Sequence, residues 1–368
     1  MRSFSVALLR KIWILVALMA AQAAHAEGIR WEALQIPAAI SGSKTYSLEA
    51  LVVRPDDGAP HPLAVINHGS PRDAANRPKM SPFGMWAQAV QFARRGWVAV
   101  TFLRRGYGRS EGAWVENFGT CGNPDYASAG RAAASDIAAV AKFMTAQSYV
   151  SKDKWISVGV SAGGFATVAL TAEAPAGLAA AIVFAPGRGS RSPDQVCDEK
   201  ELVAAFAQYG KTSRTPLLWV SSPNDHFFGP RLVAELKDAF VNAGGNVTFV
   251  AAPPFGEDGH QLFSRSGIQI WSPILDRFLG AHGLALRDSL IDVPVANVAP
   301  PSSLGASGRE AFKSYLDSAP NKAFAVSGGH FGWVSGRRSV DDAMKDALGY
   351  CTSNAVNCAV VNVNDGPR

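Results

Sequence analysis

The sequence has little charge, few cysteines and no long hydrophobic run beyond its N-terminus. Of its 368 residues, 18% are charged and 48% are hydrophobic, which excludes an intrinsically disordered chain. Residues 1–26 hold three of the 35 basic residues and none of the 30 acidic ones, so 32 face 30 in the remainder. No basic block is left there, which argues against a nucleic-acid partner.

The N-terminal segment, residues 1–26, has the pattern of an export signal. Three basic residues, two of them just before an apolar run over residues 12–21, are followed by Ala-His-Ala at residues 24–26. This predicts a secretory signal peptide that is cut after Ala26. An uncleaved membrane anchor is the alternative, but the run is short for a span of about 20 residues. We therefore expect export to the periplasm or the medium, with no stable membrane insertion once the signal is removed.

Only four cysteines are present: Cys121, Cys197, Cys351 and Cys358. In an oxidising compartment an even count favours disulfides, and four cysteines allow three pairings. Proximity favours Cys351–Cys358, which leaves Cys121 for Cys197, and free buried thiols are the alternative. None has the C-x-x-C spacing of a zinc site, and the one Gly-rich loop lacks the Lys-Ser/Thr ending of a phosphate-binding loop. We expect no metal, nucleotide or flavin cofactor.

From residue 46 to residue 282, strand-like and helix-like segments alternate. The strand-like segments are residues 48–54, 63–67, 97–103, 155–160, 178–185, 216–220 and 246–251. The helix-like segments are residues 86–95, 127–146, 165–174, 230–243 and 268–279. Near-continuous apolar strands that alternate with helices predict a mostly parallel sheet covered on both faces.

The pattern changes after about residue 284. Residues 285–308 contain Pro and Gly-Ser clusters without periodicity and are predicted to be a linker. A small unit follows, with a helix over residues 310–316, a hairpin over residues 323–335 and a last strand over residues 358–363. A second helix begins after Ser339, which forms a capping-box pattern with Asp342.

One pentapeptide carries the strongest chemical signal, Gly159-Val160-Ser161-Ala162-Gly163. The G-x-S-x-G pattern alone is weak, but this copy lies directly between an apolar strand and a helical segment, as a nucleophile elbow requires. The flanking glycines remove Cβ atoms that would clash in such a sharp turn. The serine oxygen then lies at the start of a helix, where backbone N–H groups and the helix dipole favour negative charge. Ser161 is the candidate nucleophile.

A serine hydroxyl needs a base, and after such an elbow an acid and then a histidine should follow. Asp225 and His260 each lie in a loop after an apolar strand, in that order. We expect His260 to take the proton from Ser161 and return it to the leaving group, and Asp225 to orient His260. Asp258 is the alternative acid, although two residues from His260 is an awkward distance for that role.

Two backbone N–H groups should stabilise the oxyanion. One belongs to Ala162, the residue after the nucleophile, and the other comes from a loop after an earlier strand. Residues 67–71 (Asn-His-Gly-Ser-Pro) form that loop. The N–H of Ser70 is the expected donor and that of Gly69 is the alternative, whereas His68 is interpreted as structural.

Two further loops are expected to shape the substrate site. One holds Trp114 and Phe118, which predict an apolar wall, and the other spans residues 187–213. A disulfide between the cysteines of these loops would join them over the pocket. In the second loop, Arg188 and Arg191 could bind an acidic substrate group, but solvated charges are the simpler interpretation.

Taken together, these residues resemble the α/β-hydrolase superfamily. The first strand, the His68-Gly69 turn, the stretch RRGYGRSEG at residues 104–112, the elbow, the acid and the histidine occur in family order over about residues 46–282. The sequence looks most like the dienelactone-hydrolase and prolyl-peptidase-like branch, which includes X-Pro peptidase and cocaine-esterase relatives. The Arg-Gly-x-Gly-x-Ser-x-Gly stretch points to that branch, and we interpret it as a loop former and substrate-side wall, with Tyr107 as a wall residue.

The resemblance implies a catalytic α/β-hydrolase domain over residues 27–284, the linker, and a small α+β domain over residues 309–368. Dienelactone hydrolases carry Cys in the elbow, so Ser161 fits a serine esterase or peptidase better. The C-terminal unit is similar to a small secreted domain of unknown function, and this similarity implies no activity.

The leading hypothesis is a secreted serine hydrolase that cleaves a small carboxylic ester through an acyl-enzyme with a Ser-Asp-His triad. A serine peptidase or amidase of the prolyl-peptidase type comes second. A binding module with an idle triad, in which the C-terminal unit is the working part, comes third. No pattern in the sequence predicts the oligomeric state.

Overall fold

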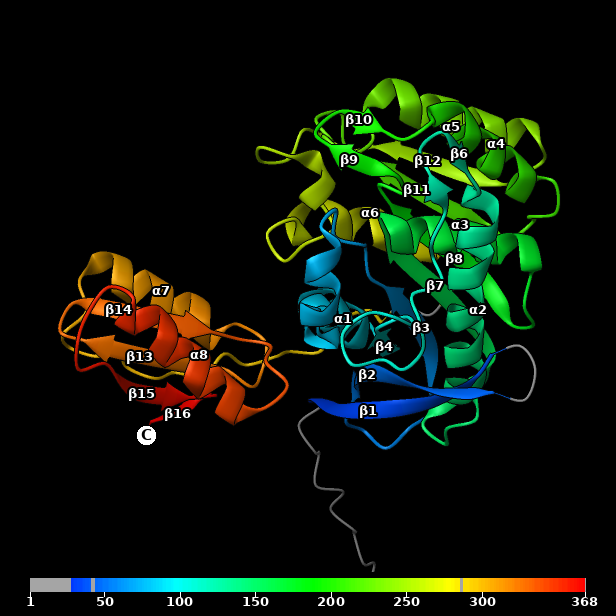
Figure 1. The fold of residues 1–368 in the computed structure, drawn as a ribbon. Helices are drawn as coiled ribbons and strands as arrows, with labels where there is room; N and C mark the ends of the chain where they lie inside the picture. The colour runs from blue at the N-terminus through cyan, green and yellow to red at the C-terminus, as the bar shows by residue number, and fades with distance from the viewer. Residues whose placement is uncertain (1–27, 41–43, 285–286, 368) are drawn as a thin grey trace, which may run out of the picture.

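The computed structural model describes residues 28–40, 44–284 and 287–367, so the predicted signal peptide over residues 1–26 lies outside the described residues. Eight strands form one sheet in the order β1-β2-β4-β3-β7-β8-β11-β12 (Figure 1). Every neighbouring pair from β4 to β12 is parallel, whereas β2 is antiparallel to both β1 and β4. The strands are β1 (Ile29–Ala39), β2 (Thr45–Pro55), β3 (His61–Asn67), β4 (Val98–Phe102), β7 (Val150–Val160), β8 (Leu178–Phe184), β11 (Leu217–Ser221) and β12 (Val247–Ala251).

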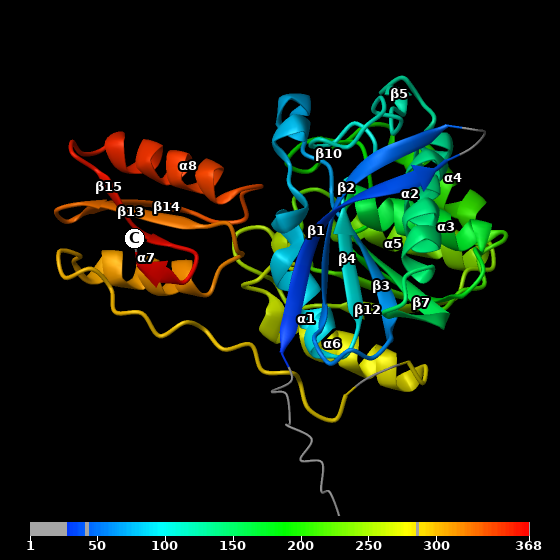
Figure 2. The same ribbon diagram turned by 90° about the horizontal axis from the view of Figure 1, so that it is seen from below.

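Helices cover both faces of this sheet, as the alternating pattern predicted (Figure 2). One face carries α1 (Trp86–Arg94) and α6 (Ile268–Ala281), whose buried residues share a core with every second residue of the strands. The opposite face carries α2 (Tyr126–Thr145), α3 (Ala162–Glu173), α4 (Glu199–Gly210) and α5 (Pro230–Asn242). Because both faces are buried, the central strands are continuous apolar runs rather than alternating ones.

The first strand was missed in the sequence. Residues 29–33 alternate apolar and polar side chains, and this period of two is the signal for a half-buried strand. β1 pairs with β2 along its whole length, from Ile29 opposite Pro55 to Ala39 opposite Thr45. It is an edge strand of the sheet, where a proline such as Pro37 is tolerated.

Short elements fill the loops above the sheet. Three are 3-10 helices, η1 (Ala74–Lys79), η2 (Pro82–Met85) and η3 (Gly259–Gln261). Two are small hairpins, β5 (Gly119–Thr120) with β6 (Asn123–Pro124) and β9 (Ser190–Ser192) with β10 (Gln195–Val196). A disulfide joins Cys121, between β5 and β6, to Cys197, just after β10. It is the pairing that sequence proximity had left for these two cysteines.

The C-terminal unit is a four-stranded antiparallel sheet with two helices, so its predicted α+β class is confirmed (Figure 1). Its strands run in the order β14 (His330–Val334), β13 (Ala323–Ser327), β15 (Ala359–Val363) and β16 (Gly366–Pro367). The helices are α7 (Ala306–Leu316) and α8 (Val340–Thr352), and Ser339 Oγ caps α8 by accepting a hydrogen bond from the N–H of Asp342. α7 begins well before the predicted Glu310, inside the segment that was predicted to be linker.

Specific contacts hold this unit to the larger one. Arg338 pairs with Glu49 of β2, with Nε 2.6 Å from Oε1, and Arg265 pairs with Asp317. A second disulfide, Cys351–Cys358, joins the end of α8 to the start of β15 and adds a covalent link to a small core. None of the helices in the described part of the chain is both long and apolar enough to span a bilayer.

Candidate active site

Ser161 occupies a strained turn between β7 and α3. Its backbone has φ 55° and ψ −124°, a conformation that costs free energy in any residue with a Cβ. A Cβ on Gly159 would lie 2.3 Å from the carbonyl oxygen of Gly163, and a Cβ on Gly163 would lie 2.4 Å from that of Asn67. Both glycines are therefore required by close backbone approach, and the turn has the geometry of the predicted elbow.

The helix that follows the turn supplies backbone N–H groups that can stabilise a negative charge. Ala162 is the first residue of α3, so its N–H has no intrahelical acceptor. The positive end of the helix dipole lies at the same place. Ser161 is 7% exposed, and it lines a cavity of about 490 Å³ together with Ala162 and Ser70.

His260 and Asp225 form a buried pair at the same edge of the sheet. Asp225 follows β11, and His260 lies in η3 after β12. The Nδ1 atom of His260 lies 3.1 and 3.0 Å from the two carboxylate oxygens of Asp225. Asp225 also accepts hydrogen bonds from the N–H groups of Phe227 and Phe228, at 2.7 and 2.9 Å, which fix the carboxylate. With Nδ1 bound to Asp225, Nε2 is the nitrogen left for proton transfer.

Asp258, the rival acid, has another role. Its Oδ1 atom accepts hydrogen bonds from the backbone N–H groups of His226 and His260, both at 3.0 Å. It therefore shapes the loop that carries His260. The structure brings Asp225, and not Asp258, to the ring of the candidate base.

Phe227 connects the histidine to the cavity. Its ring stacks on the imidazole of His260, with centroids 3.8 Å apart and an angle of 11° between the planes. The guanidinium group of Arg72 lies 3.4 Å from the centroid of the Phe227 ring. Among the described residues no hydrogen bond joins Ser161 Oγ to His260, and in ligand-free sites such bonds are commonly long and shorten when substrate binds.

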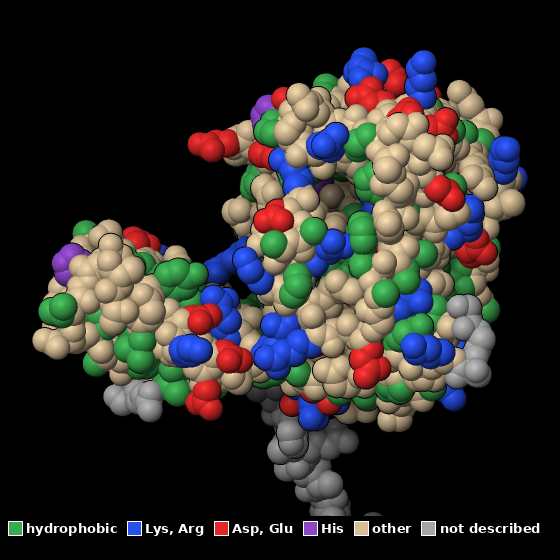
Figure 3. Space-filling view, viewed as in Figure 1, with side chains coloured by type: hydrophobic (Ala, Val, Ile, Leu, Met, Phe, Trp, Pro, Cys, Tyr) green, Lys and Arg blue, Asp and Glu red, His purple; other side chains and the backbone are tan. Residues whose placement is uncertain are grey.

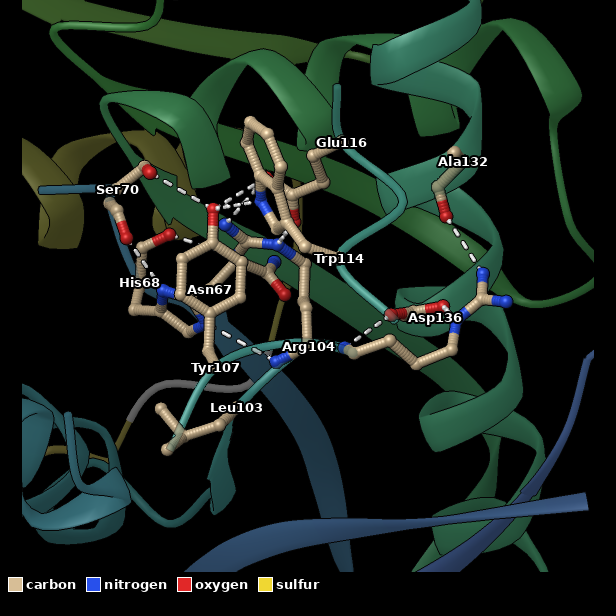
Figure 4. Close-up of polar contacts among 12 residues, drawn as sticks. Asn67, His68, Ser70, Leu103, Arg104, Tyr107, Trp114, Glu116, Ala132 and Asp136 are labelled. Carbon is tan, nitrogen blue, oxygen red and sulfur yellow. Dashed lines mark hydrogen bonds and ion pairs between the residues drawn. The ribbon is translucent and has the colours of Figure 1, made fainter. Parts of the chain in front are cut away.

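His68 holds the loop that was predicted to offer the second oxyanion donor (Figure 4). Its Nδ1 donates to the carbonyl oxygen of Gly69 at 2.6 Å, and its Nε2 accepts from the N–H of Arg104 at 3.2 Å. Burial, with the nearby Arg104, lowers the pKa of His68 to about 3, so the ring is neutral. Because a peptide unit is planar and trans, fixing the Gly69 carbonyl also fixes the Ser70 N–H, which points the opposite way.

This geometry favours Ser70 over Gly69 as the donor. Ser70 lines the cavity with Ser161 and Ala162. A Cβ built on Gly69 would lie 3.1 Å from the Cβ of Ser161, so a side chain at position 69 would crowd the candidate nucleophile. The structural role expected for His68 agrees with these contacts.

Glu116 lies at the centre of a buried network behind the loop (Figure 4). It pairs with Arg104 and with Arg188, whose Nη2 lies 2.7 Å from its Oε2. Burial raises the pKa of Glu116, but the two guanidinium groups outweigh burial and hold the pKa at about 2. The carboxylate is therefore ionised, and two positive charges surround it.

Tyr107 was expected to form a wall of the site, and the structure contradicts this. The side chain is completely buried, does not line the cavity, and has its hydroxyl 2.9 Å from both Ser70 Oγ and Glu116 Oε2. An ionised carboxylate can only accept, so the phenol donates to Glu116 and receives the hydrogen bond of Ser70. Tyr107 therefore supports the loop through its hydrogen bond with Ser70.

Some of the other residues expected around the substrate site do line the cavity. Trp114, Phe118 and both cysteines of the Cys121–Cys197 disulfide line the cavity. Arg191 is exposed, as a solvated charge would be. Arg188 is only 5% exposed and is paired with Glu116, so its interpretation as a solvated charge is wrong.

Comparison with known proteins shows to which family the chain belongs. The profile of the X-Pro dipeptidyl-peptidase family, S15, matches residues 44–228, which is half of the chain. The chain belongs to this family. It is a serine hydrolase with an α/β-hydrolase fold, and the fold and enzyme class expected from the sequence are confirmed. A comparison with curated proteins gives no match.

Several solved structures are similar to this S15-family chain. The Pyrococcus furiosus esterase Pf2001 has 14% identity and a TM-score of 0.49, over 69% of this chain and 90% of that one. The Thermogutta terrifontis esterase 2 has 19% identity and a TM-score of 0.48, over 70% and 97%. The Pyrococcus horikoshii acylaminoacyl peptidase has 16% identity and a TM-score of 0.49, over 72% and 44%. Likeness of this degree does not bear on the substrate.

Sequence reasoning missed four residues around the site: Arg72, Arg77, Glu116 and Phe227. One signal was present, because Glu116 is a lone acid between the aromatic residues of a loop that was expected to be an apolar wall. A charge in such a place needs a partner when it is buried. The partners of Glu116, Arg104 and Arg188, lie far from it along the chain and on opposite sides of it, and no local pattern connects them.

Proposed function

We propose that this chain is an exported hydrolase that cleaves carboxylic esters through an acyl-enzyme. Ser161 is the nucleophile, His260 the general base and acid, and Asp225 the residue that orients His260. The N–H groups of Ala162 and Ser70 form the oxyanion hole. The single observation that supports the proposal is the strained turn of Ser161 at the start of α3, in a cavity that Ala162 and Ser70 also line. His260, paired with the buried carboxylate of Asp225, stacks on Phe227 of the same cavity wall.

In the first half of the reaction, Nε2 of His260 accepts the proton of Ser161 while the serine oxygen attacks the ester carbonyl carbon. The tetrahedral oxyanion is stabilised by the two amides and by the positive end of α3. Asp225 stabilises the imidazolium that forms, without taking its proton. The imidazolium then protonates the alcohol oxygen, the ester bond breaks, and an acyl-Ser161 ester remains.

In the second half, a water molecule replaces the alcohol. His260 takes a proton from the water as the water attacks the acyl carbon, and the same amides hold the second oxyanion. The bond to Ser161 breaks, the serine regains a proton from His260, and the acid leaves. The cavity, bounded by Ser161 and Trp114, is the space for the substrate.

Ester substrates are favoured over peptides by the charge of the cavity. A dipeptidyl-peptidase must hold the positively charged N-terminus of its peptide, and a carboxylate is the natural partner for that group. The residues that line this cavity in the described part of the chain include four arginines and no aspartate or glutamate. A peptidase or amidase activity is the second candidate, which the match to the S15 family favours.

Export is supported by two independent features. Residues 1–26 have the composition of a cleavable signal, and all four cysteines are paired in disulfides, which persist in oxidising compartments. N-terminal sequencing of the protein recovered outside the cytoplasm should begin at Glu27. Recovery of the intact chain in the cytoplasm would contradict this part of the proposal.

The activity is tested with 4-nitrophenyl esters from acetyl to decanoyl, with Ser161→Ala measured alongside. The variant should lose about 10⁴-fold or more in kcat, because one member of the triad is removed. An organophosphonate should label Ser161 in the parent protein only. Full activity in the variant would overturn the serine mechanism, and labelling without ester turnover would move the assignment to the peptidase candidate.

A further inference from the structure

The cavity beside Ser161 is strongly positive. Four arginines line it, Arg72, Arg77, Arg188 and Arg191, and no residue of its lining is acidic within the described chain. Lys and Arg side chains also gather around the hollow on the face of the larger unit that Figure 3 shows. A cavity wall of one charge selects its ligand by charge, because the low dielectric of the surrounding protein weakens screening by water.

Arg188 is the innermost of these groups. Only 5% of it is exposed, and one of its terminal nitrogens is bound by Glu116 at 2.7 Å. Its Nε–H is buried and has no hydrogen-bond partner among the described residues. A buried donor without an acceptor is unfavourable, and buried polar groups are almost always satisfied in folded proteins. The side chain that carries this donor lines the cavity.

The buried charges around Arg188 do not balance. Glu116 is completely buried and faces both Arg104 and Arg188, so one carboxylate meets two guanidinium groups. Arg104 donates to Glu116 from Nε and Nη2 and to the carbonyl oxygen of His68 from Nη1, and it does not line the cavity. The excess positive charge therefore belongs to Arg188, the member of the cluster that lines the cavity.

Arg77 adds a second donor on the same wall. Its guanidinium group lies 3.8 Å from the centroid of the Trp114 ring, and that of Arg188 lies 5.8 Å from the same centroid. One terminal nitrogen of Arg77, Nη1, is buried without a partner in the described chain. Trp114 thus contacts two arginines, each with a buried N–H that no group in the described part of the chain accepts.

We propose that these arginines bind a carboxylate of the substrate, so that the enzyme selects esters that carry a second, free carboxylate. Arg188 and Arg77 contact the carboxylate directly, because a planar guanidinium group matches the two oxygens of a carboxylate. The more exposed Arg72 and Arg191 attract it to the cavity. The inference rests on the proposed ester hydrolysis and adds the class of ester.

Two matched pairs of esters test the proposal and show which part of the substrate is recognised. Mono-4-nitrophenyl adipate is compared with 4-nitrophenyl hexanoate, and 5-acetoxy-2-nitrobenzoate is compared with 4-nitrophenyl acetate. The first pair differs by a carboxylate on the acyl group and the second by one on the leaving group. Each kcat/KM is measured at fixed ionic strength and divided by the rate of alkaline hydrolysis of that ester.

We expect the anionic ester of at least one pair to be favoured by about ten-fold or more, the range for a hydrogen-bonded charge. Arg188→Gln and Arg77→Gln should each reduce this preference to near parity. Arg277→Gln, which removes an exposed charge of α6 outside the cavity, should leave the preference as it is. Equal kcat/KM values in both pairs, or a preference that survives both cavity variants, would overturn the inference. If Arg188→Gln fails to fold, Arg77→Gln decides.

Failure of the proposed function is recognised separately. If neither neutral nor anionic esters are hydrolysed in a Ser161-dependent way, the ester assignment fails. Binding of adipate to the full-length Ser161→Ala chain is then measured by calorimetry. Saturable binding that is lost in the Ser161→Ala, Arg77→Gln double variant would sustain the anion site without the ester reaction, and no binding would overturn it.

Discussion

What we call the nucleophile side consists of the candidate nucleophile Ser161 and its candidate partners Asp225 and His260, and each of these residues follows the carboxyl end of a parallel strand. On the arginine side, which consists of Arg72, Arg77, Arg188 and Arg191 with Trp114, the residues come from a 3-10 helix, the short strand β9 and three loops. The nucleophile side is held by backbone amides and a buried acid–base pair. The arginine side is held by ring stacking, one buried carboxylate and a disulfide.

This structural difference suggests that the nucleophile side performs the reaction, whereas the arginine side selects the substrate. Groups at strand ends are fixed by the sheet, so their mutual geometry survives changes in the surrounding loops. Groups on loops are fixed by one another, so a single lost contact releases several of them. We therefore expect changes on the nucleophile side to affect all substrates equally, and changes on the arginine side to alter the ratio between anionic and neutral esters.

The largest effect is expected for Asp225→Asn. An amide can donate to Nδ1 of His260 and favour the wrong tautomer, so kcat should fall about 10⁴-fold for neutral and anionic esters alike. Asp258→Asn is the matched control, because an asparagine oxygen can still accept from the N–H groups of His226 and His260. Asp258→Asn should lower kcat less than about ten-fold. The reverse order in steady-state kinetics would exchange the roles of the two acids.

The next effect concerns His68, which we expect to position the proposed Ser70 donor. His68→Leu removes the hydrogen bond to the Gly69 carbonyl, so kcat should fall about 100-fold with little change in KM, as for a misdirected oxyanion donor. His68→Asn can still donate to that carbonyl and should recover most of the loss. A loss confined to KM, or no recovery by asparagine, would show that His68 does not act through the oxyanion hole.

His68 also predicts how stability depends on pH. Its pKa is lowered by burial from 6.5 to about 3, so between these values the unfolded chain binds a proton that the folded chain does not. Asp136, whose pKa burial raises to about 6, acts in the opposite direction in this range, because its folded form takes up a proton that the unfolded chain does not bind. The contribution of His68 to the free energy of unfolding should therefore fall as the pH falls, by about 2 kcal/mol between pH 7 and pH 5. Urea denaturation measures this loss. The loss of unfolding free energy should be smaller in His68→Asn than in the parent protein. An equal loss in the parent and the variant would show that other groups cause it.

Glu116 affects the pH dependence of stability at lower pH than His68 does. The two guanidinium groups hold it at about 2, below the roughly 4.3 of an unfolded glutamate. The contribution of ionised Glu116 to the free energy of unfolding is complete above the unfolded pKa and is lost as the pH falls towards 2. It therefore does not disturb the measurement between pH 7 and pH 5.

The smallest effect is expected for the Cys121–Cys197 disulfide, which closes the arginine side. Replacing both cysteines by serine should reduce the preference for anionic esters about three-fold, since ordering a loosened side chain on binding costs roughly 0.5–1.5 kcal/mol. The double serine variant of Cys351 and Cys358 is the control, because that pair lies in the C-terminal unit. Equal changes in the kcat/KM ratio of both variants would contradict a local role for the first disulfide.

Much of the fold and the nucleophile side could be predicted from the sequence because their signals are local. The strand periodicity, the glycines of the elbow and the loops that hold Asp225 and His260 are each encoded within a short segment. The edge strand β1 carried such a signal too, in residues 29–33, and was overlooked rather than hidden. The assignment of Ser161, Asp225 and His260 to the reaction stays a prediction until the kinetics are measured.

The sequence by itself determined the order of strands and helices, the elbow around Ser161 and the candidates for its partners, because backbone geometry repeats over short distances along the chain. Only the tertiary structure decided that Arg188 is buried, that Tyr107 faces inward, and that one carboxylate meets two arginines. The physical reason is that burial and charge balance depend on groups brought together from distant segments. Glu116 and Arg188 belong to loops that follow different strands, and their contact exists only once the sheet has formed beneath those loops.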